Sequence, residues 1–149
     1  MDNVSKEIRS RMMAANRRRD TKPEMIVRRS LHADGFRYRL DVRGLPGRPD
    51  IVLRRYGAAI FVHGCFWHRH RGCAQASVPK SNREFWGEKF KKNIERDQRA
   101  VRDLSALEWR VGIIWECALS KERSAGTMKK VTSWLRSEAQ DNKILAFDQ

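Results

Sequence analysis

FVHGCFWHRHRGC, residues 61–73, carries three histidines, two of the chain's three cysteines and an adjacent Phe–Trp pair. A solvated loop is not expected to hold so many His, Cys and large aromatic residues together. Metal ligation, acid–base chemistry and aromatic stacking each use some of them. The segment follows an apolar run, AAIFV at 58–62, so we expect it to leave the end of a strand and to form a site there.

The strand before this segment is expected to pair with an earlier one. A turn-rich loop, DVRGLPGRPD at 41–50, leads into the apolar run IVL at 51–53, and Tyr56–Gly57 then turns the chain. In an antiparallel pair, the start of one strand neighbours the end of the next. We therefore expect Asp50 and His63 to meet at one edge of a sheet.

Helical and strand patterns predict the remaining elements. Thr21 is a good N-cap for a helix with Pro23 in its first turn and Gly35 just after its end, and Glu24 completes a capping box. Ser81 opens a second capping box. The predicted elements are helices at 4–15, 21–35, 81–107 and 127–139, a strand at 36–40, and a central buried strand, WRVGIIW, at 109–115. The class is α/β, in a single domain over 1–149.

The charge balance points to an acidic partner. The chain has 32 Lys plus Arg against 18 Asp plus Glu, a net charge of +14, which indicates a polyanion, most often nucleic acid. A basic protein with no specific polyanion partner is the alternative. Residues 1–22 are interpreted as a basic arm in which Arg17, Arg18 and Arg19 contact phosphates, or else as a solvated tail. The N-terminus has no apolar run, so we expect a cytoplasmic protein with no membrane partner.

A metal site is predicted from the cysteines. Cys65, His70 and Cys73 are spaced C-x4-H-x2-C, and Cys117 ends the apolar strand at 109–115. Together they make a Cys3His set, which is a common structural zinc shell. Three buried thiols beside an exposed histidine are the alternative. A filled shell leaves no position for substrate, so this zinc would be structural.

Two histidines remain for chemistry. Asp50 with His63 and His68 fits Mg²⁺-assisted phosphodiester hydrolysis, in which a carboxylate holds the cation and an imidazole activates water. A structural Asp–His pair is the alternative. The aromatic residues nearby would wedge between bases or stack on them, or else pack in the core or cover the zinc site; they are Phe66, Trp67 and Trp86.

The blocks LPGRPD, FVHGCFWHRH, VPKSNREFW, KNIERDQR and WRVGIIWECAL closely resemble the very-short-patch repair (Vsr-type) T:G mismatch endonucleases. The resemblance runs from about Arg9 to Leu119. It implies a restriction-endonuclease-like α/β fold (the PD-(D/E)xK type), a mixed sheet flanked by helices. It also implies a Mg²⁺-dependent nick 5′ of the thymine in double-stranded DNA, at T:G mismatches left by deamination of 5-methylcytosine.

The resemblance also implies roles for single residues. Asp50 would bind Mg²⁺, His68 would be the general base, His63 would assist at the scissile phosphate, and Glu24 would line the same site. The zinc ligands would be Cys65, His70, Cys73 and Cys117. The DNA-wedging residues would be Phe66, Trp67 and Trp86, with Met13 entering from the other groove.

Two departures from the family pattern affect the site. Val62 stands where the family usually has Thr, and it can replace that residue if the Mg²⁺ contact comes from the main-chain carbonyl. Arg69 and Arg71 flank His70, and Gly72 looks inserted before Cys73. Two other functions are open: a restriction-type endonuclease cutting paired sites, and a non-catalytic zinc-stapled DNA-binding module. We expect a monomer associated with the nucleoid, and contacts with other mismatch-repair proteins are open.

Overall fold

A five-stranded mixed sheet forms the centre of the protein, with strands in the order β1-β2-β3-β4-β5. The computed structural model describes residues 20–40, 42–137 and 143–148. The strands are β1 (Arg39–Leu40), β2 (Ile51–Leu53), β3 (Ala58–His63), β4 (Arg110–Trp115) and β5 (Ile144–Phe147). Pairing is antiparallel from β1 to β3 and parallel from β3 to β5.

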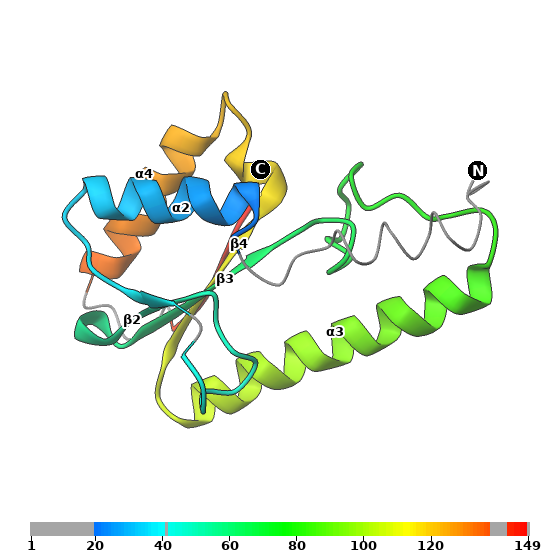
Figure 1. Ribbon diagram of the computed structural model, residues 1–149, viewed down its shortest axis with the longest axis horizontal. Coiled ribbons are helices and arrows are strands. Elements are labelled where there is room, and N and C mark those ends of the chain that lie inside the picture. Colours follow the sequence, from blue (N-terminus) through cyan, green and yellow to red (C-terminus); the bar gives the residue numbers. More distant parts are fainter. Residues whose placement is uncertain (1–19, 41, 138–142, 149) are drawn as a thin grey trace.

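Helices cover the sheet from both sides (Figure 1). The two helices α2 (Lys22–Ala33) and α4 (Ser124–Arg136) lie together on one face. The long helix α3 (Arg83–Ala106) runs along the other face and extends beyond the sheet. This arrangement confirms the predicted mixed α/β sheet flanked by helices.

The sheet brings several chain segments to one edge. The β2–β3 hairpin turns at Gly57, whose φ of 59° is left-handed, and pairs Ile51 with Ile60. Asp50 therefore precedes β2 near the end of β3, as predicted. Since β3 and β4 are parallel and pair His63 with Trp115, the segments that follow both strands leave from this same edge.

The core lies mainly on the α2/α4 face. Its fully buried side chains come from α2, from the central strands and from α4, and they include Val27, Leu31, Ile51, Leu53, Ile60, Ile114 and Val131. A smaller cluster on the other face packs α3 against β3 and β4 through Ala59, Phe61, Ala100, Leu104 and Val111. Burial of these apolar side chains fixes both layers against the sheet.

Helix α2 begins as predicted, with one difference at its cap. Thr21 is the N-cap, and its hydroxyl accepts a hydrogen bond from the Glu24 N–H at 3.3 Å. Gly35 follows the helix with a φ of 89°. The Glu24 carboxylate, however, accepts from the main-chain N–H of Asp20 at 2.6 Å, one residue before the N-cap. The carboxylate thus reaches past the usual capping-box partner.

Several predicted elements differ from the structure. The capping box at Ser81 is wrong: α3 is capped by Asn82, whose φ of 53° is left-handed and whose side chain makes no capping hydrogen bond. Asn tolerates that backbone region, so Asn82 can take the N-cap position one residue later than predicted. The strand predicted at 36–40 shrinks to β1, α4 begins at Ser124, and β5 was not predicted. The helix predicted at 4–15 lies outside the described residues.

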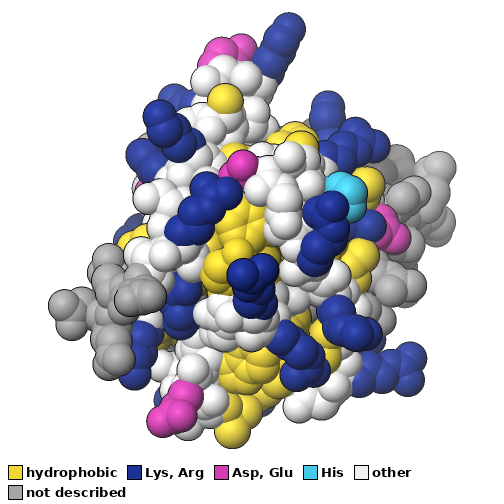
Figure 2. All heavy atoms as spheres, turned by 90° about the vertical axis from the view of Figure 1, so that its left-hand side faces the viewer, with side chains coloured by type: hydrophobic (Ala, Val, Ile, Leu, Met, Phe, Trp, Pro, Cys, Tyr) yellow, Lys and Arg dark blue, Asp and Glu magenta, His cyan; other side chains and the backbone are white. Residues whose placement is uncertain are grey.

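Basic side chains are spread over the surface. On the face shown in Figure 2, Lys and Arg side chains lie among hydrophobic patches and far outnumber Asp and Glu, in line with the net charge of +14. Within the described parts of the chain, no helix has both the length and the apolar character needed to cross a membrane.

Candidate active site and metal-binding cluster

Three cysteines and a histidine converge at the edge where β3 and β4 end. Cys65 lies two residues beyond β3, and Cys117 lies two residues beyond β4 in the 3-10 turn Glu116–Leu119. His70 and Cys73 come from the loop after β3. The ligand atoms of these four buried residues all lie within 4.8 Å of one another, so the structure brings the predicted set together.

The chemistry of this cluster suits a soft dication. Burial, with the neighbouring Cys117 thiol, raises the pKa of Cys65 to about 12. A thiolate at this place is therefore costly without a positive partner, and Zn²⁺ with thiolate and imidazole ligands supplies one. Gly72 adopts a left-handed conformation at φ 74° just before Cys73. With this backbone turn, both His70 and Cys73 reach the cluster.

Two carboxylates lie on the neighbouring side of the edge. The Asp50 carboxylate accepts a hydrogen bond from the Val62 main-chain N–H at 2.7 Å. Burial, followed by the negative charges of Glu24 and Asp97, raises the pKa of Asp50 to about 7. Asp50 thus contacts the main chain one residue before His63. The His63 ring itself packs against aromatic and imidazole rings.

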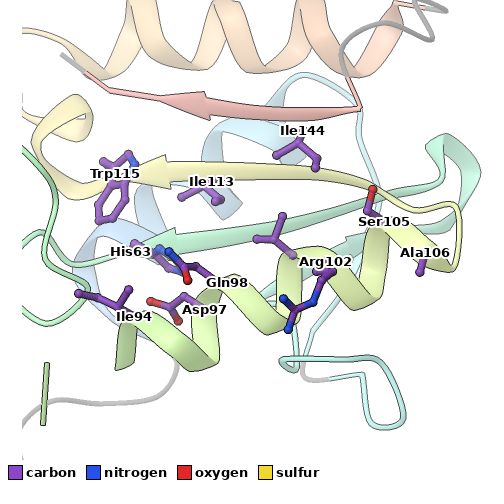
Figure 3. A pocket seen from close by; sticks show the side chains of 11 residues that line it. His63, Ile94, Asp97, Gln98, Arg102, Ser105, Ala106, Ile113, Trp115 and Ile144 are labelled. Atoms are coloured by element: carbon purple, nitrogen blue, oxygen red, sulfur yellow. The ribbon is translucent and has the colours of Figure 1, made fainter. Parts of the chain in front are cut away.

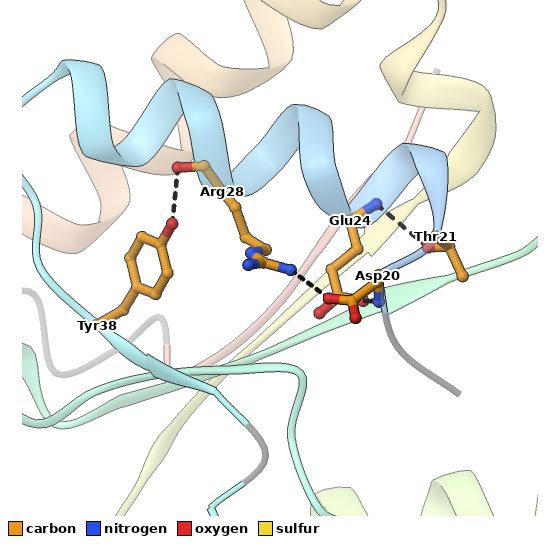
Figure 4. Close-up of polar contacts among 5 residues, drawn as sticks. All are labelled: Asp20, Thr21, Glu24, Arg28 and Tyr38. Carbon is orange, nitrogen blue, oxygen red and sulfur yellow. Dashed lines mark hydrogen bonds and ion pairs between the residues drawn. The ribbon is translucent and has the colours of Figure 1, made fainter. Parts of the chain in front are cut away.

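Glu24 is held in the same region by the start of α2 (Figure 4). Its side chain is only 2% exposed, and burial raises its pKa. One carboxylate oxygen accepts from the Asp20 N–H, while Oε1 is buried without a hydrogen-bond partner in the described structure. Arg28 holds Asp20 through an ion pair of 2.6 Å, and Tyr38 donates to the Arg28 carbonyl at 3.1 Å. Glu24 is therefore both a capping residue and a buried acid with a free oxygen.

The two remaining histidines stack on each other next to a third carboxylate. The rings of His63 and His68 are parallel within 3°, with centroids 3.9 Å apart. His68 Nδ1 lies 2.6 Å from Asp97 Oδ2. Burial, followed by the nearby His68, lowers the pKa of His63 to about 3, so this imidazole is neutral at physiological pH. Sequence reasoning missed Asp97, although it lies in the KNIERDQR block.

These three residues are close enough to suggest a second metal site, with ligand atoms within 4.8 Å of one another. The ring geometry disfavours it. Imidazole lone pairs lie in the ring plane, so two parallel stacked rings do not direct their nitrogens at one ion. His68 Nδ1 is also already bonded to Asp97. The arrangement is better suited to moving a proton than to holding a metal.

An aromatic cluster fills the loop between the two sets of ligands. Phe66 and Trp67 are half-buried and meet edge-on, with ring centroids 5.1 Å apart. Trp86 is 2% exposed and stacks on Phe90 behind them, whereas Phe85 is 40% exposed. The structure therefore places Phe66 and Trp67 nearer the surface than Trp86.

Arg69 ties this loop together. Its guanidinium donates to the main-chain carbonyls of Phe66 at 3.2 Å, Ala76 at 2.9 Å and Ser77 at 2.9 Å. It also lies over the Phe90 ring, 4.0 Å from its centroid. From α3, the Asn93 side-chain amide donates to the Trp67 carbonyl at 3.0 Å. Arg69 is thus a structural part of the aromatic loop.

A cleft of about 700 Å³ opens beside the histidines, between α3 and the strands β4 and β5. Figure 3 shows His63 and Asp97 at one end, with Ile113 and Ile144 on the strand side. Ile94 and Ile144 are 37% and 49% exposed there. On β4, Ile113 and Trp115 line this cleft and are only half-buried. The prediction that the strand at 109–115 is buried on both faces therefore holds only in part. The predicted DNA contacts Met13, Arg17, Arg18 and Arg19 lie outside the described residues.

Known proteins resemble this chain over most of its length. It is 45% identical over 119 residues to the type II nicking enzyme V.XorIIP of Xanthomonas oryzae pv. oryzae, covering 80% of this chain and 87% of that protein. It is 43% identical over 114 residues to V.NmeAIP, a type II nicking enzyme of Neisseria meningitidis serogroup A, with 76% and 81% covered. It is 41% identical over 142 residues to the DNA mismatch endonuclease Vsr of Escherichia coli K12, with 93% and 90% covered.

The sequence profile of a family described as DNA mismatch endonuclease Vsr matches residues 1–75, the half that carries Glu24, Asp50 and most of the Cys/His segment. The relatives extend the likeness to as much as 93% of this chain, and they are named as endonucleases and nicking enzymes. The chain therefore belongs to the Vsr family of DNA mismatch endonucleases.

Proposed function

We propose that this endonuclease uses Mg²⁺ to nick one strand of double-stranded DNA, 5′ of the thymine in T:G mismatches left by deamination of 5-methylcytosine. The observation that carries the proposal is the meeting of the buried acid Glu24, the half-buried acid Asp50 and a His–Asp pair at the end of β3. Glu24 and Asp50 supply oxygen ligands there, and His68 with Asp97 supplies a base. A cut on one strand fits the relatives that are named nicking enzymes.

The acids fit a hard cation. Glu24 Oε1 is buried with no hydrogen-bond partner among the described residues, and the pKa of Asp50 is raised to about 7 by burial and by negative neighbours. Both features are relieved by a dication with oxygen ligands, which is what Mg²⁺ prefers. Asp50, Glu24 and the main-chain carbonyl of Val62 would hold it. Bound there, Mg²⁺ polarises the scissile phosphate.

His68 is the general base of the proposal. The Asp97 carboxylate accepts the Nδ1–H of His68, which leaves the Nε2 lone pair free to take a proton from the attacking water. Asp97 also stabilises the imidazolium that results. His63, neutral and stacked on His68, orients that ring and would assist at the scissile phosphate. A neutral His63 avoids placing a second positive charge next to the protonated His68.

The aromatic loop is the proposed mismatch reader. Phe66 and Trp67 wedge into the base stack at the mismatch, and Trp86 is the third ring of the set. A wedge unstacks a base step at a cost of a few kcal/mol, and a mismatched pair lowers that cost. From the N-terminal arm, residues 1–22, Met13 enters the other groove, and Arg17, Arg18 and Arg19 contact phosphates.

The cluster of Cys65, His70, Cys73 and Cys117 holds Zn²⁺ in this proposal. These residues come from the loop after β3 and the turn after β4, so a bound metal would tie the two segments together and hold the wedge and the histidines relative to the sheet. We further propose that residues 1–149 form one domain that acts as a monomer on the bacterial nucleoid.

Nicking of matched and mismatched duplexes tests the function. With Mg²⁺, the full-length protein should nick a duplex with one T:G mismatch 5′ of the thymine and leave the T:A duplex intact. Asp50→Ala and His68→Ala should each lower the rate by about 10²–10⁴-fold while binding is retained. Asp103→Ala, which removes an exposed carboxylate of α3, is the matched control. Equal cutting of both duplexes would instead support the restriction-type alternative.

A further inference from the structure

The last described residues bring a carboxylate to the Cys/His cluster. β5 pairs in parallel with β4, from Val111 opposite Ile144 to Ile114 opposite Phe147. The carboxyl ends of both strands therefore lie at the same edge. Cys117 follows β4 at that edge, and Asp148 follows β5. The Phe147 side chain is 6% exposed and packs edge-on against Trp134, which anchors the end of β5.

The imidazole of His70 is held on three sides. Its Nδ1 lies 3.4 Å from the Cys117 sulfur, so this nitrogen faces the thiols. Its plane stacks on Trp115, with ring centroids 4.2 Å apart and an interplanar angle of 12°. Its Nε2 lies 3.2 Å from Asp148 Oδ2. The stacking restricts rotation of the ring, and the two nitrogens therefore have different partners.

This geometry decides which nitrogen carries the proton. A neutral imidazole has one N–H, and a carboxylate only accepts hydrogen bonds. Contact with Asp148 therefore favours the proton on Nε2, which leaves the Nδ1 lone pair directed at the three sulfurs. We propose that Asp148 is a positioning residue of the zinc site: its carboxylate accepts the Nε2–H of His70 and so presents Nδ1 to the metal. The proposal rests on the zinc assignment made above.

The size of the effect follows from the exposure of the carboxylate. Histidine ligands commonly donate their second N–H to a carboxylate, and loss of that partner typically weakens metal binding by about 10–100-fold. The Asp148 side chain is 52% exposed and its contact is 3.2 Å long. Water therefore screens the interaction, and we expect the lower end of that range. β5 thus contributes to the metal site as well as to the sheet.

Zinc competition on the full-length protein tests the proposal. Wild type, Asp148→Ala, Asp148→Asn and the control Asp103→Ala are each titrated against a chromophoric chelator. Asp148→Ala should bind zinc about tenfold more weakly, and Asp103→Ala should match the wild type. Asp148→Asn keeps an oxygen acceptor, so its loss should be smaller. Failure of the wild type to bind zinc would overturn the zinc assignment; wild-type affinity in Asp148→Ala would overturn only the role of Asp148.

Two further readouts separate positioning from simple stabilisation. Nitrogen-15 NMR of the zinc-loaded protein should show His70 protonated at Nε2 and metal-bound at Nδ1, and the opposite assignment would contradict the proposal. Asp148→Ala should lower the melting temperature of the zinc-loaded protein more than that of the zinc-free protein. Equal losses in both forms would show that Asp148 serves only the strand.

Discussion

Asp50→Asn should stabilise the Mg²⁺-free protein while it abolishes nicking. The pKa of Asp50 is raised from 3.8 to about 7 by burial and by the charges of Glu24 and Asp97. As the pH rises, the unfolded chain loses this proton first, so the folded state binds more protons between these two values. Stability is therefore lost as the pH rises toward the folded pKa. Asparagine keeps an oxygen for the Val62 N–H and carries no charge.

The magnitude follows from the two pKa values. Relative to an unshifted carboxyl, the raised pKa of Asp50 lowers the free energy of unfolding by about 2 kcal/mol at pH 5, where only the unfolded chain is ionised, and by about 4 kcal/mol at pH 8. The stability difference between Asp50→Asn and wild type should therefore grow by about 2–3 kcal/mol over this range. Repacking around the amide shifts the difference equally at both pH values, so the pH dependence is the informative quantity.

Urea unfolding of the zinc-loaded protein, dialysed free of excess divalent cation, measures this difference at each pH. Asp103→Asn, at an exposed position of α3, is the control and should run parallel to the wild type. Added Mg²⁺ should narrow the gap at pH 8, because it binds the folded wild type and not the variant. A difference that stays constant within about 0.5 kcal/mol from pH 5 to pH 8 would refute the reasoning.

Three more substitutions test how the aromatic loop and the Asp50 loop are held. Arg69→Ala removes three hydrogen bonds to loop carbonyls and should cost about 2–4 kcal/mol in urea unfolding. Arg69→Lys should recover little of this stability because lysine lacks the forked donors of a guanidinium. An unchanged urea midpoint in Arg69→Ala would contradict the structural role of Arg69. Asn93→Ala removes the donor to the Trp67 carbonyl. The free energy of unfolding should fall by about 1–3 kcal/mol, and T:G nicking should slow. A loss of stability with an unchanged nicking rate would show that this hydrogen bond does not serve the aromatic loop's part in nicking. Gly47→Ala places a Cβ 2.3 Å from the Cβ of Ala100 at a φ of 74°, so it should lower the melting temperature. Adding Ala100→Gly should recover part of the loss. An unchanged melting temperature in Gly47→Ala would show that the loop moves freely away from α3.

Local sequence signals predicted the parts of the site that depend on nearby residues. The turn at Tyr56–Gly57 and the apolar runs on either side set the β2–β3 hairpin, so Asp50 could be placed beside the end of β3. The spacing within residues 61–73 likewise predicted the cluster, and Cys117 followed from the end of an apolar strand.

Long-range partners were not predictable in the same way. Asp97 meets His68 across 29 residues, and on the sequence its helix offers a charged surface typical of a solvated face. Asp148 meets His70 across 78 residues and follows a strand of four residues, ILAF, too short for a clear pattern. Helical spacing also left the choice between Phe85 and Trp86 open, because adjacent positions on a helix differ by about 100° in direction.

Trp115 links the two sets of histidines. Its ring stacks on His70 at 4.2 Å and meets His63 edge-on at 5.2 Å. Residues that share a packing partner are energetically coupled, so changes at these two histidines should be non-additive. Substitutions at one histidine will therefore alter how the other tolerates change, so this indole couples the Cys/His cluster to the proposed hydrolytic centre.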